Sequence, residues 1–161
     1  MRGRGERLAK LGAAMASVLG FDEQRTAFVA RLTALGRLHD VVPGDDYDPL
    51  SRLGREARAS DAQTAKRILG VSPTFAEFAP VLGACAEWFD GTGLPARLKG
   101  EEIPAIARLL AVAMAADAME AASTLPITTN LPDIPVRLAA AAGTQFDPAM
   151  VEAYVTARGA Q

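Results

Sequence analysis

The chain has 161 residues, of which half are hydrophobic but only 6% are aromatic, and alanine alone makes up about a fifth. This length suits one compact domain, and the alanine-rich, aromatic-poor composition favours closely packed helices over a β-sandwich. The formal net charge of −2 provides no overall field for binding nucleic acid or an anionic membrane, so neither is expected as a partner. A single cysteine cannot form an internal disulfide, which indicates a reducing, cytoplasmic setting.

Three further possibilities are excluded by the sequence: a membrane-spanning helix, a secretory signal and a His- or Cys-rich metal site. The most apolar stretch, residues 109–116, is far shorter than the roughly 20 residues that a membrane-spanning helix requires. No apolar segment follows the basic N-terminus, so it does not read as a secretory signal. With one His and one Cys, the chain cannot build a metal site rich in either residue.

The first third of the chain predicts two helices and a loop. The first helix spans residues 6–19 and stops at Gly20. Its inward stripe consists of Leu8, Leu11, Met15, Val18 and Leu19. Asp22 caps the second helix, which runs up to His39-Asp40. Its inward residues are Phe28, Leu32, Leu35 and Leu38. Residues 41–52 are rich in Pro, Gly and Asp and form a loop.

The rest of the chain predicts further helices separated by irregular segments. A short helix begins at Ser60, and another opens near Ser72 with Thr74 and Glu77 at capping-box spacing and runs to about residue 88. Residues 89–103 form a loop, Pro104 begins the most apolar helix, residues 123–135 are irregular, and Asp147 caps a last helix. No segment shows sustained β alternation. The expected fold is therefore all-α, a single compact bundle of about six to seven helices.

One long motif carries a family resemblance. Residues 87–95 read EWFDGTGLP, residues 98–104 read LKGEEIP, and residues 107–113 read ARLLAVA. In order and spacing this segment resembles the HD-GYP family of HD-superfamily phosphodiesterases that cleave cyclic di-GMP, written approximately HHExxDGxGYPxxLKGxxIPxxARIxxVADxxDA. Further anchors are His39-Asp40, LGF at 19–21 and GTQFDP at 143–148. The resemblance spans nearly the whole chain and implies an HD-type helical domain over residues 1–161, which could be a fragment of a longer multidomain signalling protein.

The family's chemistry depends on metal ions, and most of the implied ligands differ here. Paired metals activate a water molecule and clamp the phosphate of the substrate. His39 and Asp40 match the family's His-Asp pair, and Asp61 falls near the next ligand position. Other ligand positions of the motif hold Arg4, Cys85, Ala86 and Met114, while Asp117 matches a second Asp of the pattern. The lysine after the His-Asp pair falls at Pro43, the loop tyrosine is Leu94, and residues 125–127 replace an Arg-Pro-Tyr motif.

His39, Asp40 and Asp61 are therefore the remnant metal ligands, and no cofactor is expected. A metal bound by these three residues would be Fe, Mn or Zn. Each candidate also has a structural interpretation. His39 at a helix end reads more simply as a hydrogen-bonded core residue, Cys85 as a small buried hydrophobe, and Met114 as a side chain that fills the space left by the metal and substrate.

The Gly- and Pro-rich loop is the candidate surface for a partner or a nucleotide. Its residues are Trp88, Asp90, Gly91, Gly93, Leu94, Pro95, Arg97 and Lys99. Trp88 and Phe89 are expected to divide between core and surface, because an aromatic residue beside such a loop is a typical interface anchor. Asp90 can start an Asx turn, the glycines permit positive φ, and Arg97 and Lys99 are either anion-binding or simply solvated charges.

Three functions follow as hypotheses. The first is a catalytically degenerate regulatory or protein-interaction module in bacterial signalling, whose partners are other signalling domains or a second copy of the chain. The second is a residual metal-dependent phosphodiesterase that cleaves cyclic di-GMP with His39, Asp40 and Asp61. The third is a sensor that binds a cyclic dinucleotide without hydrolysis, through Arg97, Lys99 and Arg108. The loss of metal ligands favours the first hypothesis.

Overall fold

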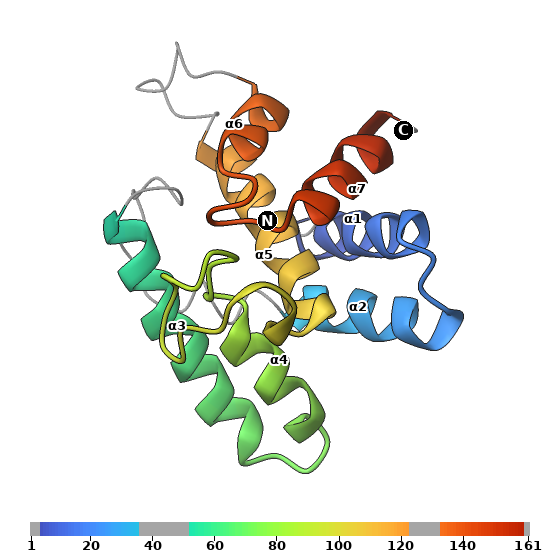
Figure 1. Ribbon diagram of the computed structural model, residues 1–161. Coiled ribbons are helices and arrows are strands. Elements are labelled where there is room, and N and C mark those ends of the chain that lie inside the picture. Colours follow the sequence, from blue (N-terminus) through green and yellow to red (C-terminus); the bar gives the residue numbers. More distant parts are fainter. Residues whose placement is uncertain (1–3, 36–51, 123–132, 160–161) are drawn as a thin grey trace.

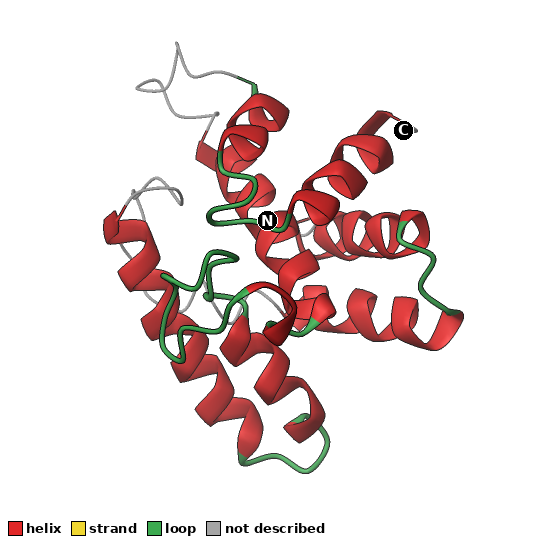
Figure 2. Ribbon diagram, viewed as in Figure 1, coloured by secondary structure: helices red, strands yellow, loops and turns green. Residues whose placement is uncertain are grey.

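The computed structural model describes residues 4–35, 52–122 and 133–159. Within these ranges the protein consists of helices, turns and loops and has no β-strand (Figure 2). The elements, in chain order, are α1 (Arg4–Val18), α2 (Glu23–Leu35), α3 (Arg52–Gly70), η2 (Ala76–Phe78), α4 (Ala79–Ala84), η3 (Gly100–Glu102), α5 (Ala105–Ala122), α6 (Ile134–Ala140) and α7 (Pro148–Gly159). The prediction of an all-α fold is confirmed.

Helix α5 lies at the centre of the molecule (Figure 1). On one side, α1 packs against α2, α7 and α5, and on the other side α3 pairs with α4. Helices α6 and α7 also contact α5. The segment between α4 and α5 loops through the middle of the view beside α3 and α4 (Figure 1). The two helical groups are therefore joined through α5.

The composition of α5 explains its central place. Residues 109–113 and residues 115–117 are all buried, so the helix is covered around most of its circumference. A helix that is apolar all round is stable only inside a fold, and its many alanines allow neighbouring helices to approach closely. Leu109 and Val112 pack with α1, α6 and α7, whereas Ala107 and Leu110 pack with Leu82 and the α4 side. One helix thus contributes to two hydrophobic clusters.

The predicted caps of three helices are confirmed. The carboxylate of Asp22 accepts a hydrogen bond from the Arg25 amide at 2.7 Å, and that of Asp147 accepts one from the Ala149 amide at 2.9 Å. Helix α1 ends just before Gly20, whose φ of +72° ends the helix. These contacts satisfy amides that the first helical turn leaves without intrahelical partners.

Two predicted helix starts are wrong. Helix α3 begins at Arg52 rather than Ser60, because the Arg, Glu and Ala residues of 52–59 are strong helix formers even without an apolar stripe. The capping box expected at Thr74 and Glu77 is absent, and η2 follows a residue, Phe75, that makes no side-chain cap. Helix α4 begins only at Ala79 because Pro80 fits the first turn of a helix and would break the interior of a longer one.

Three other predictions also need correction. Helix α4 ends at Ala84, short of the expected residue 88. Helix α6 was not predicted from the sequence. Pro135 was assigned to an irregular segment, but in the structure it lies in the first turn of this helix. On α1, Val18 is 46% exposed, and the buried stripe turns toward Ala16 instead. Leu35, Leu38 and residues 36–51, including His39 and Asp40, lie outside the residues whose side chains are described, as do residues 123–132.

No helix in the described ranges is long and apolar enough to cross a membrane.

Candidate functional site

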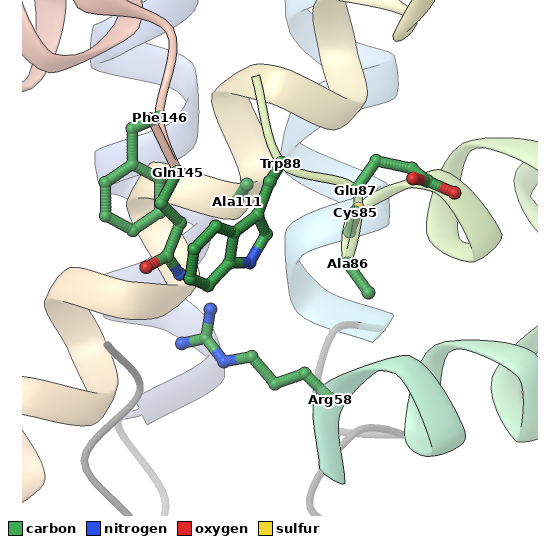
Figure 3. A pocket seen from close by; sticks show the side chains of 8 residues that line it. All are labelled: Arg58, Cys85, Ala86, Glu87, Trp88, Ala111, Gln145 and Phe146. Carbon is green, nitrogen blue, oxygen red and sulfur yellow. The ribbon is translucent and has the colours of Figure 1, made fainter. Parts of the chain in front are cut away.

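A small cavity lies where α3, the end of α4, α5 and the segment before α7 meet (Figure 3). Its volume is about 10 Å³, room for about one water molecule. The residues that line it are Arg58, Cys85, Ala86, Glu87, Trp88, Ala111, Gln145 and Phe146. Two of these, Cys85 and Ala86, occupy the positions where the resembling motif has paired histidines. The cavity is therefore the place to test for metal-binding chemistry.

Cys85 is a neutral thiol in this cavity. It follows directly on α4 and is buried, and its Sγ donates to the carbonyl oxygen of Val81 at 3.3 Å. Desolvation raises the pKa of the Cys85 thiol to about 12, although the positive charge of Arg58 acts in the opposite direction. A thiol with so high a pKa is protonated at neutral pH and is therefore a poor nucleophile. The interpretation of Cys85 as a small buried hydrophobe is confirmed.

Ala86 provides packing in place of a ligand. Its methyl group lies in a buried cluster with Ala59 and Ala62 of α3, against which Leu94 also packs. A methyl group has no lone pair to offer a metal. Leu94, at the position of the motif's tyrosine, is half-buried and ties the loop to α3.

Glu87 holds the loop that follows. Its side chain is buried, and its two carboxylate oxygens accept backbone hydrogen bonds from Ala96 at 2.7 Å and Leu98 at 3.2 Å. A buried carboxylate requires such charge-assisted bonds. No role was assigned to Glu87 from the sequence, although its place at the start of the motif was a signal that it anchors the loop.

The loop is folded tightly by its own turn and by its neighbours. The carboxylate of Asp90 accepts hydrogen bonds from the Thr92 amide at 2.8 Å and the Thr92 hydroxyl at 2.7 Å, which confirms the predicted Asx turn. The amides of Phe89 and Asp90 donate to the carbonyls of Gln145 and Thr144 at 3.2 and 2.9 Å. The loop is thereby bonded to the segment just before α7.

Two glycines of the loop are required by geometry. Gly91 has a φ of +86°, a conformation that L side chains rarely adopt. At Gly93 a Cβ atom would lie 2.0 Å from the backbone nitrogen of Trp88, so no larger residue fits without moving the backbone. The Leu94-Pro95 peptide bond is cis. This part of the loop therefore has a defined shape that its sequence specifies.

The loop residues proposed for partner binding divide into two groups. Pro95, Arg97 and Lys99 are exposed, whereas Asp90 and Leu94 are half-buried and Gly93 is buried. Trp88 and Phe89 are both half-buried, and the Trp88 ring lies against the cavity (Figure 3). Of the residues proposed for binding, the accessible ones are thus Pro95, Arg97 and Lys99, which form an exposed rim.

Arg108 is engaged elsewhere. Its guanidinium forms an ion pair with Asp147, with the two side chains only 15% and 7% exposed, and its Nε donates to the Ile103 carbonyl at 2.9 Å. Arg108 therefore joins the end of the loop to α5 and the start of α7. This geometry corrects the hypothesis that Arg108 takes part in a nucleotide site.

Of the three residues predicted as remnant metal ligands, only Asp61 lies in the described part of the chain, and it is buried on α3 with 8% exposure. Met114 is half-buried and packs against both large hydrophobic clusters, and Asp117 is buried one turn further along α5. In the described ranges no three His, Cys, Asp or Glu side chains lie close enough together to hold a metal ion. With a neutral thiol at Cys85 and a methyl at Ala86, the described side of the cavity does not fit a metal centre.

Comparison with known proteins defines the class. The model of the HD domain family matches residues 1–150, so the chain belongs to this family. A protein of Vibrio cholerae serotype O1 named a cyclic di-GMP phosphodiesterase is 36% identical over 104 residues, which cover 65% of this chain. That alignment covers 20% of the relative, so the chain spans about a fifth of its length.

A solved structure has the same fold. The crystal structure of a cyclic GMP-AMP-specific phosphodiesterase from V. cholerae superimposes with a TM-score of 0.67 over 97% of this chain and 44% of the other. The sequence identity is 17%, so this likeness concerns the arrangement of the helices.

Proposed function

We propose that this chain is a single HD-GYP-like domain that has lost its catalytic chemistry and serves as a regulatory or protein-interaction module in bacterial signalling. The observation that carries this proposal is the pair Cys85 and Ala86. At the positions of the motif's histidines they present a buried neutral thiol and a methyl group.

The chemistry of phosphodiester cleavage explains why this pair matters. The reaction needs a water of lowered pKa and a positive charge on the phosphate oxygens, which paired metal ions supply together. Each metal needs several deprotonated ligands with oriented supporting groups. Losing two adjacent ligands removes donors that the other elements cannot replace from a distance.

The loop supports an interaction role. Its backbone is held by Glu87, by the Asp90 turn and by two bonds to the segment before α7. A surface that is already ordered loses little conformational entropy on binding. Pro95, Arg97 and Lys99 form its exposed rim and would contact another signalling domain or a second copy of the chain.

A second candidate is a sensor that binds cyclic di-GMP without cutting it. The relative named a cyclic di-GMP phosphodiesterase and the two exposed cations Arg97 and Lys99 favour it. With Arg108 paired to Asp147, only these two cations of the original three face solvent. We rank this function below the interaction module.

The deciding experiment measures hydrolysis and binding with the same protein. We expect no hydrolysis of cyclic di-GMP or bis(p-nitrophenyl) phosphate in the presence of Fe²⁺, Mn²⁺ or Zn²⁺. Turnover that disappears in His39→Ala would establish the residual phosphodiesterase and overturn the proposal. Calorimetric binding of cyclic di-GMP that is lost in Arg97→Ala/Lys99→Ala, without turnover, would support the sensor instead.

A further inference from the structure

Arg58 is the one permanently charged cation among the residues that line the described cavity. It lies on α3, half-buried, and its guanidinium reaches across the cavity toward the Trp88 ring and the Gln145 amide (Figure 3). Arg58 was not singled out from the sequence, although it precedes Asp61 by three residues and so shares its helix face. Its charge cannot be removed by any pH that leaves the fold intact.

The other lining residues offer a divalent cation almost nothing. Both carboxylate oxygens of Glu87 already accept backbone hydrogen bonds, and an indole N–H donates but does not accept. The Cys85 thiol donates to the Val81 carbonyl. Of the lining side chains, the Gln145 amide oxygen alone adds a neutral acceptor, which is far from a complete ligand set.

The guanidinium also opposes a metal by its charge. It lines the same cavity as Cys85 and Ala86, so it lies near the positions where the motif has histidines. A divalent ion entering the same small space would be repelled at short range in a partly desolvated environment. The cavity is therefore organised around a cation that the chain itself provides.

We propose that the Arg58 guanidinium supplies the positive charge of this pocket, and that the pocket packs around Arg58 instead of around a metal ion. This inference rests on the proposed loss of catalytic function, but it makes a separate claim about which group occupies the site.

The first test uses the unmodified protein. Its melting temperature should change by less than about 1 °C on adding Mn²⁺, Zn²⁺ or EDTA, because only a metal that binds the folded state would raise the stability of that state. The metal content after dialysis should stay below about 0.1 per chain. A stoichiometric metal that raises the melting temperature and is removed by EDTA would overturn the inference.

The second test asks whether Arg58 excludes the metal. In Cys85→His/Ala86→His protein, adding Arg58→Met should tighten Zn²⁺ binding at least about tenfold, since the substitution removes a like charge beside the restored ligands. Arg67→Met, on the exposed face of the same helix, is the matched control and should leave the affinity unchanged. Equal affinities with and without Arg58 would overturn the inference.

The third test covers the case in which the double-histidine protein does not fold. Arg58→Met alone should lower the melting temperature by about 2–4 °C, the shift expected for roughly 1 kcal/mol in a chain of this size, while Arg67→Met lowers it by less than 1 °C. Equal shifts would count against the inference.

Failures of the two proposals are distinguishable. A stoichiometric metal in the wild-type pocket without turnover overturns the inference and leaves the interaction module standing. Turnover that survives Arg58→Met in a protein with no metal near Cys85 overturns the proposed function and leaves the inference standing.

Discussion

The region around α5 and the cavity beside Arg58 share three residues, Cys85, Ala111 and Phe146, yet they are built differently. Around α5 most of the buried side chains are apolar, and small residues bring the helices together. At the cavity, a cation, an indole and an amide come together (Figure 3), and backbone hydrogen bonds hold the adjoining loop. The contrast supports our proposal that the fold can persist without the family's metal ligands, because the apolar core does not depend on the polar groups of the pocket.

The largest effect should come from the ion pair that connects the two regions. Arg108→Met leaves the Asp147 carboxylate buried without its partner, so we expect a loss of about 3–5 kcal/mol in the free energy of unfolding. Urea denaturation measures it. The matched control is Arg158→Met, which breaks an ion pair with Glu120 that is nearly half exposed and should cost less than about 1 kcal/mol. Equal losses would mean that burial of the Arg108 pair is unimportant.

The apolar core should respond to a cavity. Leu109 is fully buried between α5 and the α1, α6 and α7 side, and Leu109→Ala should cost about 2–5 kcal/mol because the space left does not fully collapse. Chemical denaturation gives the value. Val71→Ala, at a residue that is 84% exposed, should change stability by no more than about 0.5 kcal/mol. A similar cost at both positions would contradict the described core.

Glu87 tests whether the loop depends on a single side chain. In Glu87→Gln, one of the two acceptor oxygens becomes an NH₂ donor facing a backbone amide, so we expect a loss of about 1–3 kcal/mol. Hydrogen exchange should accelerate at the Ala96 and Leu98 amides and remain unchanged in α7. The exposed Glu101→Gln is the control. Unchanged exchange at both amides would remove Glu87 from its anchoring role.

The smallest effect concerns the pH dependence contributed by Cys85. Because the folded protein holds the thiol proton more tightly, this contribution is fully present below pH 9 and is lost as the pH rises from 9 toward 12. The free energy of unfolding should be measured for the wild type and for Cys85→Ala between pH 9 and pH 12. The difference between the two proteins should become smaller as the pH rises. Native protein should also resist iodoacetamide at pH 8 and react after unfolding. Rapid native alkylation would show that the thiol is exposed or ionised.

Sequence patterns predicted most of the helices but not every start. The stop at Gly20 and the caps at Asp22 and Asp147 were identified correctly because they depend on local residues. The starts of α3 and α4 and the whole of α6 were not, since Pro80 and Pro135 act as first-turn residues only in the context of the surrounding chain. Where a local pattern is compatible with both a loop and a helix, the residues against which the segment packs determine which of the two forms.

The candidate site was predicted only in part. The motif located the loop, and Cys85 was correctly expected to be buried. Glu87 and Arg58 were missed because the roles of both depend on distant partners: the backbone amides of residues 96 and 98, and the segment that contains Gln145. The metal assignments of His39 and Asp40 stay predictions.

The sequence by itself determined the all-α class, the HD-type motif and the presence of Cys and Ala at residues 85 and 86, because composition, spacing and residue identity need no coordinates. Only the tertiary structure decided that Arg108 is paired with Asp147, that the Trp88 ring faces inward and that Arg58 reaches the cavity. The physical reason is that the ionic partner and the orientation of a side chain depend on neighbours in space that are far away along the chain.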